Sequence, residues 1–122
     1  MLAQASLDRL GLAFEVGIYE AALRREPERL PVLEALGNAY ARAGRLEKGL
    51  EVDRRICAIV PGNPVAHYNL ACTLSRMGET DEAADALQHA IALGYRDKDQ
   101  IETDPDLENL RASKRYREIA GC

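Results

Sequence analysis

The two histidines are the residues of this chain best suited to acid–base or metal chemistry, because imidazole titrates near neutral pH. Neither His67 nor His89 has a second ligand at the spacing of a recognised metal motif. No nucleophile with a partnered base can be assembled from residues that are close in sequence. The sequence therefore predicts a protein that is not an enzyme, with no catalytic residue, no metal ligand and no cofactor.

The three cysteines, Cys57, Cys72 and Cys122, are an odd number without the close pairing of a zinc or redox motif. A disulfide framework is not expected, and a reducing compartment suits such thiols best. A lone Cys commonly packs as a small hydrophobe, which is our expectation for Cys57. A reactive thiol is the alternative for Cys72, and it would require an exposed side chain.

Acidic residues gather near the C-terminus, where they could bind a cation or a basic partner. A calcium loop needs closely alternating oxygen ligands, a Gly at the turn and a late Glu, whereas this stretch contains Pro105 and no Gly. We expect these residues to serve as helix caps and as a solvated linker. The series consists of Asp97, Asp99, Glu102, Asp104, Asp106 and Glu108.

The composition is that of an ordinary folded domain with no basic patch. The chain has 122 residues, 47% of them apolar and 30% charged, with a formal net charge of −4. This charge gives no reason to expect nucleic acid or an anionic membrane as partner. Asp8 and Arg9 interrupt the N-terminal stretch where a secretion signal would be apolar, and no segment approaches the ~20 apolar residues of a membrane span. We expect a cytoplasmic protein.

The stretch from Leu30 to Asn63 has the pattern of one helix–turn–helix unit. Apolar and small residues share one face of its first helix at the spacing of 3.6 residues per turn, and Gly44 then provides a C-terminal cap. Pro61-Gly62 ends the second helix. The face of the first helix consists of Leu33, Leu36, Gly37 and Tyr40.

The pattern recurs at an offset of 34 residues, which aligns Leu36 with Leu70, Arg42 with Arg76, Gly44 with Gly78 and Ala58 with Ala92. This period and these positions resemble the tetratricopeptide repeat. The resemblance implies an all-α fold, a right-handed superhelical stack of antiparallel helix hairpins with a C-terminal capping helix. We expect one domain over 1–122, composed of a truncated repeat (1–29), two full repeats (30–63 and 64–97) and a cap (98–122).

Local signals place the helices within these segments. Gly11 marks a turn between two expected helices, roughly Leu2–Leu10 and Leu12–Arg25, although the helical spacing of the apolar residues around it also allows one long helix. Pro31 suits a first helical turn, Asn63-Pro64 is a strong helix start, and Thr80 is expected to cap the helix after it. Asp104-Pro105 is another start of the same kind.

Two positions depart from the repeat pattern. Gly49 replaces the usual Ala of a second helix, which predicts either close helix approach or local looseness. Asp53 stands where an aromatic residue is usual, which predicts thinner packing toward the next repeat. His67 falls in a large-residue packing position, and His89 falls on the exposed side of its helix.

The resemblance also implies a concave groove lined by the first helices of the repeats. Asn38 and Asn69 match two asparagines of the family's carboxylate clamp, but Glu34 replaces its first lysine, so binding of chaperone tails is not supported. Amides and guanidiniums can still hold an acidic segment, or Arg42 and Arg76 can simply complement the helix dipoles. The predicted protein-binding groove consists of Glu34, Asn38, Arg42, Tyr68, Asn69, Cys72 and Arg76.

The resemblance implies an adaptor or scaffold that binds another protein or peptide in this groove. The two arginines favour a partner segment with acidic residues. A self-associating structural module is the alternative, with a homodimer formed through the N-terminal hairpin. An enzyme subunit is the least favoured class, because no acid–base or metal constellation emerges. The residues expected to supply the homodimer contact are Leu7, Leu10, Phe14 and Ile18.

Overall fold

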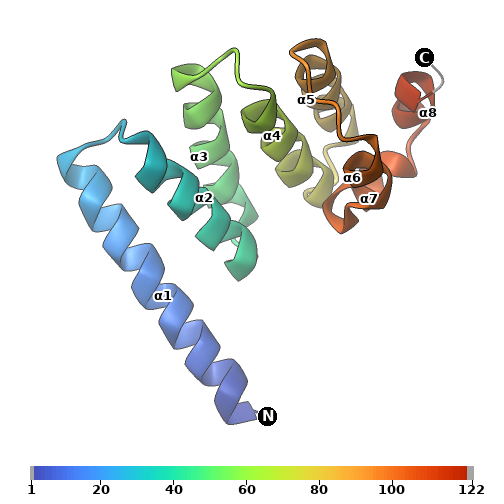
Figure 1. Cartoon of the computed structure of the whole chain (residues 1–122). Coiled ribbons are helices and arrows are strands. Elements are labelled where there is room, and N and C mark those ends of the chain that lie inside the picture. Colours follow the sequence, from blue (N-terminus) through green and yellow to red (C-terminus); the bar gives the residue numbers. More distant parts are fainter. Residues whose placement is uncertain (1, 121–122) are drawn as a thin grey trace. The chain divides into compact units, whose positions relative to one another are not determined.

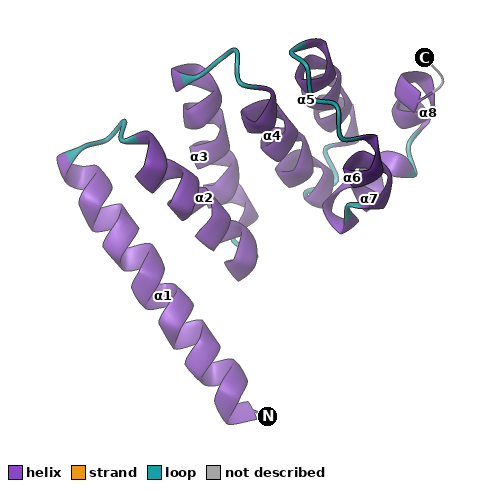
Figure 2. Ribbon diagram, viewed as in Figure 1, coloured by secondary structure: helices purple, strands orange, loops and turns teal. Residues whose placement is uncertain are grey.

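The computed structural model describes the backbone of residues 2–120 and the side chains of residues 7–120, so Cys122 lies outside the described residues. Every regular element in this range is helical, and none is a strand (Figure 2). The predicted all-α fold is confirmed. The elements are α1 (Leu2–Arg25), α2 (Leu30–Ala43), α3 (Leu46–Ile59), α4 (Pro64–Arg76), α5 (Thr80–Ala92), α6 (Lys98–Thr103), the 3-10 helix η1 (Pro105–Leu107), α7 (Glu108–Arg111) and α8 (Lys114–Ala120).

The chain divides into two compact units, residues 1–52 and residues 53–122, and the boundary falls within α3. In unit 1, α1 and α2 pack as an antiparallel pair, and the N-terminal part of α1 extends past the end of α2 (Figure 1). The prediction of two helices before residue 26 is wrong, because α1 is continuous. Gly11 keeps a helical backbone, and an established helix propagates through a Gly at a cost of only ~1 kcal/mol.

Helix α2, the first helix of the repeat over residues 30–63, buries the face that its apolar spacing predicts. Leu33 and Leu36 are buried, and the buried Tyr40 hydroxyl donates to Glu20 Oε2 of α1 at 2.6 Å. Burial, helped by this hydrogen bond, raises the pKa of Tyr40 to about 12. A Cβ on Gly49 would lie 3.7 Å from the Tyr40 Cβ, which is an ordinary van der Waals contact. Gly49 therefore packs against α2, but this distance would also accommodate an alanine.

Glycine ends two helices at the predicted positions, 34 residues apart in the sequence. Gly44 has φ 71° and Gly78 has φ 81°, both in the left-handed region that disfavours side chains. The amide after each glycine bonds back to the helix, from Arg45 N to Tyr40 O at 2.9 Å and from Glu79 N to Leu74 O at 2.9 Å. These are the bonds that satisfy the last carbonyls of a helix, so both caps are confirmed.

Of the other predicted helix starts, those at Asn63 and Pro31 are confirmed and the one at Thr80 is corrected. Asn63 accepts hydrogen bonds from the amides of Val65 and Ala66, as a cap should. Pro31 lies in the first turn of α2, also as expected. Thr80 is not a cap, because α5 already includes it and Glu79 occupies the preceding position without a side-chain hydrogen bond.

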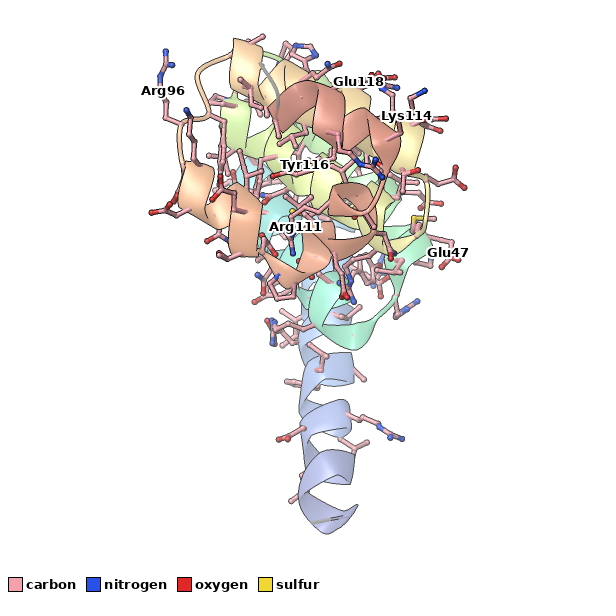
Figure 3. All side chains as sticks on the ribbon, turned by 90° about the vertical axis from the view of Figure 1, so that its right-hand side faces the viewer. Glu47, Arg96, Arg111, Lys114, Tyr116 and Glu118 are labelled. Carbon is pink, nitrogen blue, oxygen red and sulfur yellow. The ribbon has the colours of Figure 1, made fainter. Side chains whose placement is uncertain are left out.

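Unit 2 is built on the α4–α5 pair, whose contact consists largely of small side chains. The C-terminal segment packs on this pair, with η1 and α7 against α4 and with α8 against α5. Leu107 and Leu110 of that segment are fully buried. Figure 3 shows α8 nearest the viewer, with Lys114 and Glu118 pointing outward and Arg111 lying beneath Tyr116. The buried small residues of α4 and α5 are Ala66, Ala71, Ser75, Ala83, Ala84, Ala86 and Ala90.

Asp53 lies half-buried in α3, and it receives a hydrogen bond from Thr73 Oγ1 of α4 at 2.6 Å. Burial raises the pKa of Asp53 to about 6, although the Thr73 hydrogen bond acts in the opposite direction. The folded chain thus holds this proton more tightly than the unfolded chain does. Its contribution to the free energy of unfolding is fully present below pH ~4 and is lost as the pH rises through about 6.

We expect Asp53→Asn to leave stability near pH 4 unchanged and to raise the free energy of unfolding at pH 8 by about 1–2 kcal/mol, after allowance for partial exposure. Urea unfolding across this pH range measures the effect. Asp99→Asn, at an exposed position on α6, is the matched control. A variant with the same pH dependence as the wild-type chain would contradict the burial argument.

Candidate protein-interaction site

The predicted groove residues of unit 1 are exposed on α2, and two of them form a bonded set. Arg42 Nε donates to Asn38 Oδ1 at 2.8 Å, one helical turn away, and Arg42 Nη2 donates to Glu15 Oε1 of α1 at 2.7 Å. The hydrogen bond from Arg42, with a second one from Tyr19, lowers the pKa of Glu15. Glu34 lies closer to the start of α2 and is also exposed. Arg42 is therefore a guanidinium that is already oriented and already partly neutralised.

The groove residues of unit 2 behave differently, because two of them are interior. Tyr68 is 5% exposed and Cys72 is 7% exposed. The Tyr68 ring stacks on Tyr95 with the centroids 4.2 Å apart and the planes 5° from parallel. The exposed side chain that a reactive Cys72 would require is therefore absent, and Tyr68 does not lie on the surface of the predicted groove. Both side chains are covered by residues that follow α5.

Asp104 is the buried carboxylate that closes this region. Its Oδ2 accepts hydrogen bonds from the Tyr68 hydroxyl at 2.7 Å and from Gln100 Nε2 at 2.9 Å, and the Cys72 thiol lies 3.8 Å away. Its Oδ1 accepts from Asp106 N at 2.9 Å, the cap expected before Pro105. Burial alone would raise the pKa of Asp104, but the hydrogen bonds outweigh it and the pKa is lowered.

The potential ligand atoms of Cys72, Asp104 and Asp106 lie within 4.8 Å of one another. Their surroundings favour a hydrogen-bonded cluster over a cation site, because the Asp104 oxygens already accept several donors. Burial, with the nearby carboxylate of Asp104, also raises the pKa of the Cys72 thiol, which opposes the thiolate form that binds metals. We interpret the cluster as the lock that holds the C-terminal segment on α4.

Further hydrogen bonds fix the same segment to α4. Asn109 Nδ2 donates to the carbonyl oxygen of Ser75 at 2.9 Å, and Leu110 N donates to Ser75 Oγ at 3.1 Å. Arg111 Nη1 donates to the carbonyl oxygens of Ile101 and Asp104. Sequence reasoning gave Ser75 and Arg111 no role, because each bond depends on a contact that the repeat period does not encode.

The remaining groove residues of unit 2 stay near the surface. Asn69 is exposed, whereas Arg76 is half-buried, with its Nε 3.9 Å from Asp106 Oδ1. The two histidines lie as predicted, His67 buried and His89 exposed. Their rings stack at 4.2 Å, and His67 Nε2 lies 2.8 Å from the Pro61 carbonyl oxygen.

Unit 1 also displays an apolar stripe on α1, on the side opposite the residues that pack against α2. Large apolar side chains at helical spacing are left mostly in solvent there. These are the residues that the sequence predicts as a homodimer contact. Their exposed fractions are 61% for Leu7, 68% for Leu10, 72% for Phe14 and 51% for Ile18.

Comparisons with known proteins agree with the hairpin pattern. Two family models, both described as tetratricopeptide repeat, match residues 16–64 and residues 54–85. A chloroplastic protein of Arabidopsis thaliana is 35% identical over 86 residues, which cover 66% of this chain and 25% of that protein. Superkiller protein 3 of Schizosaccharomyces pombe is 31% identical over 75 residues, covering 62% of this chain and 5% of that protein.

The chain therefore spans a quarter or less of the length of these relatives. The cytoplasmic localisation stays a prediction, since the name of one relative places that protein in the chloroplast. Among the described residues, no helix is long and apolar enough to cross a membrane.

The lock at Asp104 can be tested by its removal. We expect Asp104→Ala to lower the free energy of unfolding by about 2–4 kcal/mol, because Tyr68 and Gln100 lose a charged acceptor and η1 loses its cap. Asp97→Ala removes an exposed cap, the acceptor for Gln100 N, and should cost only about 1 kcal/mol. Alkylation of Cys72, followed by peptide mass spectrometry, should accelerate in Asp104→Ala alone. Equal effects of the two variants on stability and on alkylation would show that Asp104 is no more than a surface cap.

Proposed function

We propose that this chain, which belongs to the tetratricopeptide repeat family, is a protein-interaction module that binds an acidic segment of a partner protein. Repeats of this family generally mediate protein–protein interaction, and the family is typically non-enzymatic. The observation that carries the proposal is the exposed, pre-oriented guanidinium of Arg42. Its bonds to Asn38 and Glu15 use Nε and Nη2, and Nη1 is the nitrogen that we propose donates to a partner carboxylate.

Unit 2 supports the same proposal through the surface of α4 that its own C-terminal segment leaves uncovered. Asn69 supplies an exposed side-chain amide, and Arg76 supplies the guanidinium one repeat after Arg42. A partner carboxylate at Arg76 must compete with Asp106, so its gain there is small. The side chains of Tyr68 and Cys72 are buried inside unit 2 and stabilise α4.

The charge of these two arginines provides the test. Arg42→Glu with Arg76→Glu should weaken capture of an acidic partner at least fivefold and leave the helical content unchanged, because exposed ion pairs contribute ~0.2–1 kcal/mol each and reversal adds repulsion. Capture by the intact tagged chain, quantified by mass spectrometry, gives the readout. Lys48→Glu with Lys114→Glu, two exposed residues, makes the same change in net charge. Partners retained equally by both variants would rule out these arginines as the binding surface.

A homodimer is the second candidate function, and the apolar stripe of α1 favours it. In an antiparallel pairing of two α1 helices, Leu7 lies opposite Ile18 of the second copy and Leu10 lies opposite its Phe14. The four side chains expose roughly 500 Å² per copy, so they would contribute at most about 1,000 Å² to the pairing, the lower limit for a specific interface. Such a dimer would be weak and dependent on concentration.

We expect Leu10→Glu with Phe14→Glu to lower the mass of the chain in solution from that of a dimer to that of a monomer, without loss of helicity. Analytical ultracentrifugation at several concentrations measures this change. Val65→Glu with Ile91→Glu removes two other exposed apolar side chains and should leave the mass unchanged. A wild-type chain that stays monomeric at the highest concentration would exclude the dimer.

A further inference from the structure

Unit 1 contains an open pocket of about 390 Å³ between the extending part of α1 and the end of α2. The floor is apolar, formed by Leu12, Ala13 and Val16 of α1 and by Ala43 of α2. The pocket is at the small end of the ~300–1,000 Å³ typical of ligand sites, which is enough for an apolar side chain and its neighbours. Figure 1 shows that α1 continues beyond the last turn of α2.

The rim of this pocket is cationic. Arg9, Arg42 and Arg45 line it together with a single acidic residue, Asp8. Arg42 is bonded to Glu15, but Arg9 and Arg45 form no ion pair within the part of the chain that the structure describes. Arg45 is instead held over the Tyr40 ring, 5.1 Å from its centroid, which fixes its position beside the pocket. An apolar floor and a surplus of guanidiniums complement an anionic ligand with an apolar group.

We propose that this pocket receives an apolar side chain flanked by Asp or Glu, from an acidic segment of a partner protein. The proposal rests on the proposed interaction function and extends its contact site at Arg42, which also lines this pocket, onto α1. The pocket does not include Asn69 or Arg76. The flanking carboxylates bind Arg9 and Arg45, and the apolar side chain fills the space above Ala13 and Val16. The pocket also differs from the dimer stripe, because residues 9, 12, 13 and 16 point away from residues 7, 10, 14 and 18 on one helix.

An NMR titration of the full-length ¹⁵N-labelled chain tests the pocket directly. The probe is the peptide acetyl-Gly-Glu-Leu-Asp-Gly-amide, with a Gln/Asn peptide that removes the charge and a Glu-Gly-Asp peptide that removes the apolar side chain. We expect amide shifts around residues 9–16 and 42–45 with the first peptide, and at least fivefold weaker binding of the other two. Shifts confined to other residues, or no shift at millimolar peptide, would overturn the proposal.

Two kinds of variant test the charge of the arginines and the space of the pocket separately. Arg9→Glu with Arg45→Glu should weaken the peptide at least fivefold, and Ala13→Trp should block it by filling the space without a change of charge. Arg24→Glu with Arg25→Glu, at the other end of α1, is the matched control and should bind as the wild-type chain does. Arg9→Gln with Arg45→Gln removes the same two charges without reversing them. Circular dichroism of this variant shows whether loss of the Arg45 contact with Tyr40 disturbs folding. Binding that survives both the Glu and the Trp variants would contradict the assignment.

Two further comparisons distinguish the possible failures. Loss of captured partners in Arg42→Glu with Arg76→Glu, but not in Arg9→Glu with Arg45→Glu, would refute the pocket and keep the interaction function. Loss in neither pair would refute both. Sodium octanoate, tested at the peptide concentrations, must bind more weakly than the peptide, since equal or tighter binding would assign the pocket to free fatty acids.

Discussion

The close contact between α4 and α5 is the constraint on which unit 2 depends. Helices approach closely only where the side chains between them are small, and Ala71 of α4 and Ala83, Ala84 and Ala90 of α5 are completely buried. The larger Leu74 and Leu87 fill the remaining core. A larger residue at any of these alanines would force the pair apart, at a typical cost of ~1–3 kcal/mol. It would also displace the C-terminal segment, which rests on both helices.

That segment determines which surfaces remain for other proteins. Its buried leucines extend the core, and Asp104 joins it to Tyr68 and Cys72 by hydrogen bonds inside the unit. The aromatic and thiol side chains of α4 are thereby used within the chain. The surfaces that we propose for a partner are therefore the polar residues of α2 and α4 that stay exposed, together with the apolar stripe and the cationic pocket of α1.

The predictability of each feature depends on the distance over which its cause acts. The glycine stops at Gly44 and Gly78 and the cap at Asn63 follow from a few neighbouring residues, so the sequence was sufficient for the fold class and most helix ends. Continuity of α1 through Gly11 was not predictable in this way, because a local turn signal is overruled when the surrounding helix propagates. The expected cap at Thr80 was also misplaced, because α5 already includes Thr80 as its first residue.

The candidate site was harder to predict, because its key contacts join residues that are distant in sequence. Tyr68 and Asp104 are 36 residues apart, and Arg42 and Glu15 are 27 apart. The repeat period correctly places Asn38, Asn69 and the arginines on exposed or partly exposed helix faces. It says nothing of whether a later segment covers a given face. The buried state of Tyr68 and Cys72 therefore had no signal beyond the cap motif at Asp104-Pro105.

The central claim is that the C-terminal segment is an integral part of unit 2, locked on α4 by Asp104. Native-state amide hydrogen exchange, resolved by NMR, measures this most directly, because amides that open together exchange with one free energy. We expect the protected amides of α7 and of the Asp104 cluster, including Leu110, to exchange with the same free energy as those of α4 and α5. Exchange of these amides by an opening several kcal/mol easier than that of α4 would contradict the account, since the segment would then detach by itself and expose Tyr68 and Cys72 to partners.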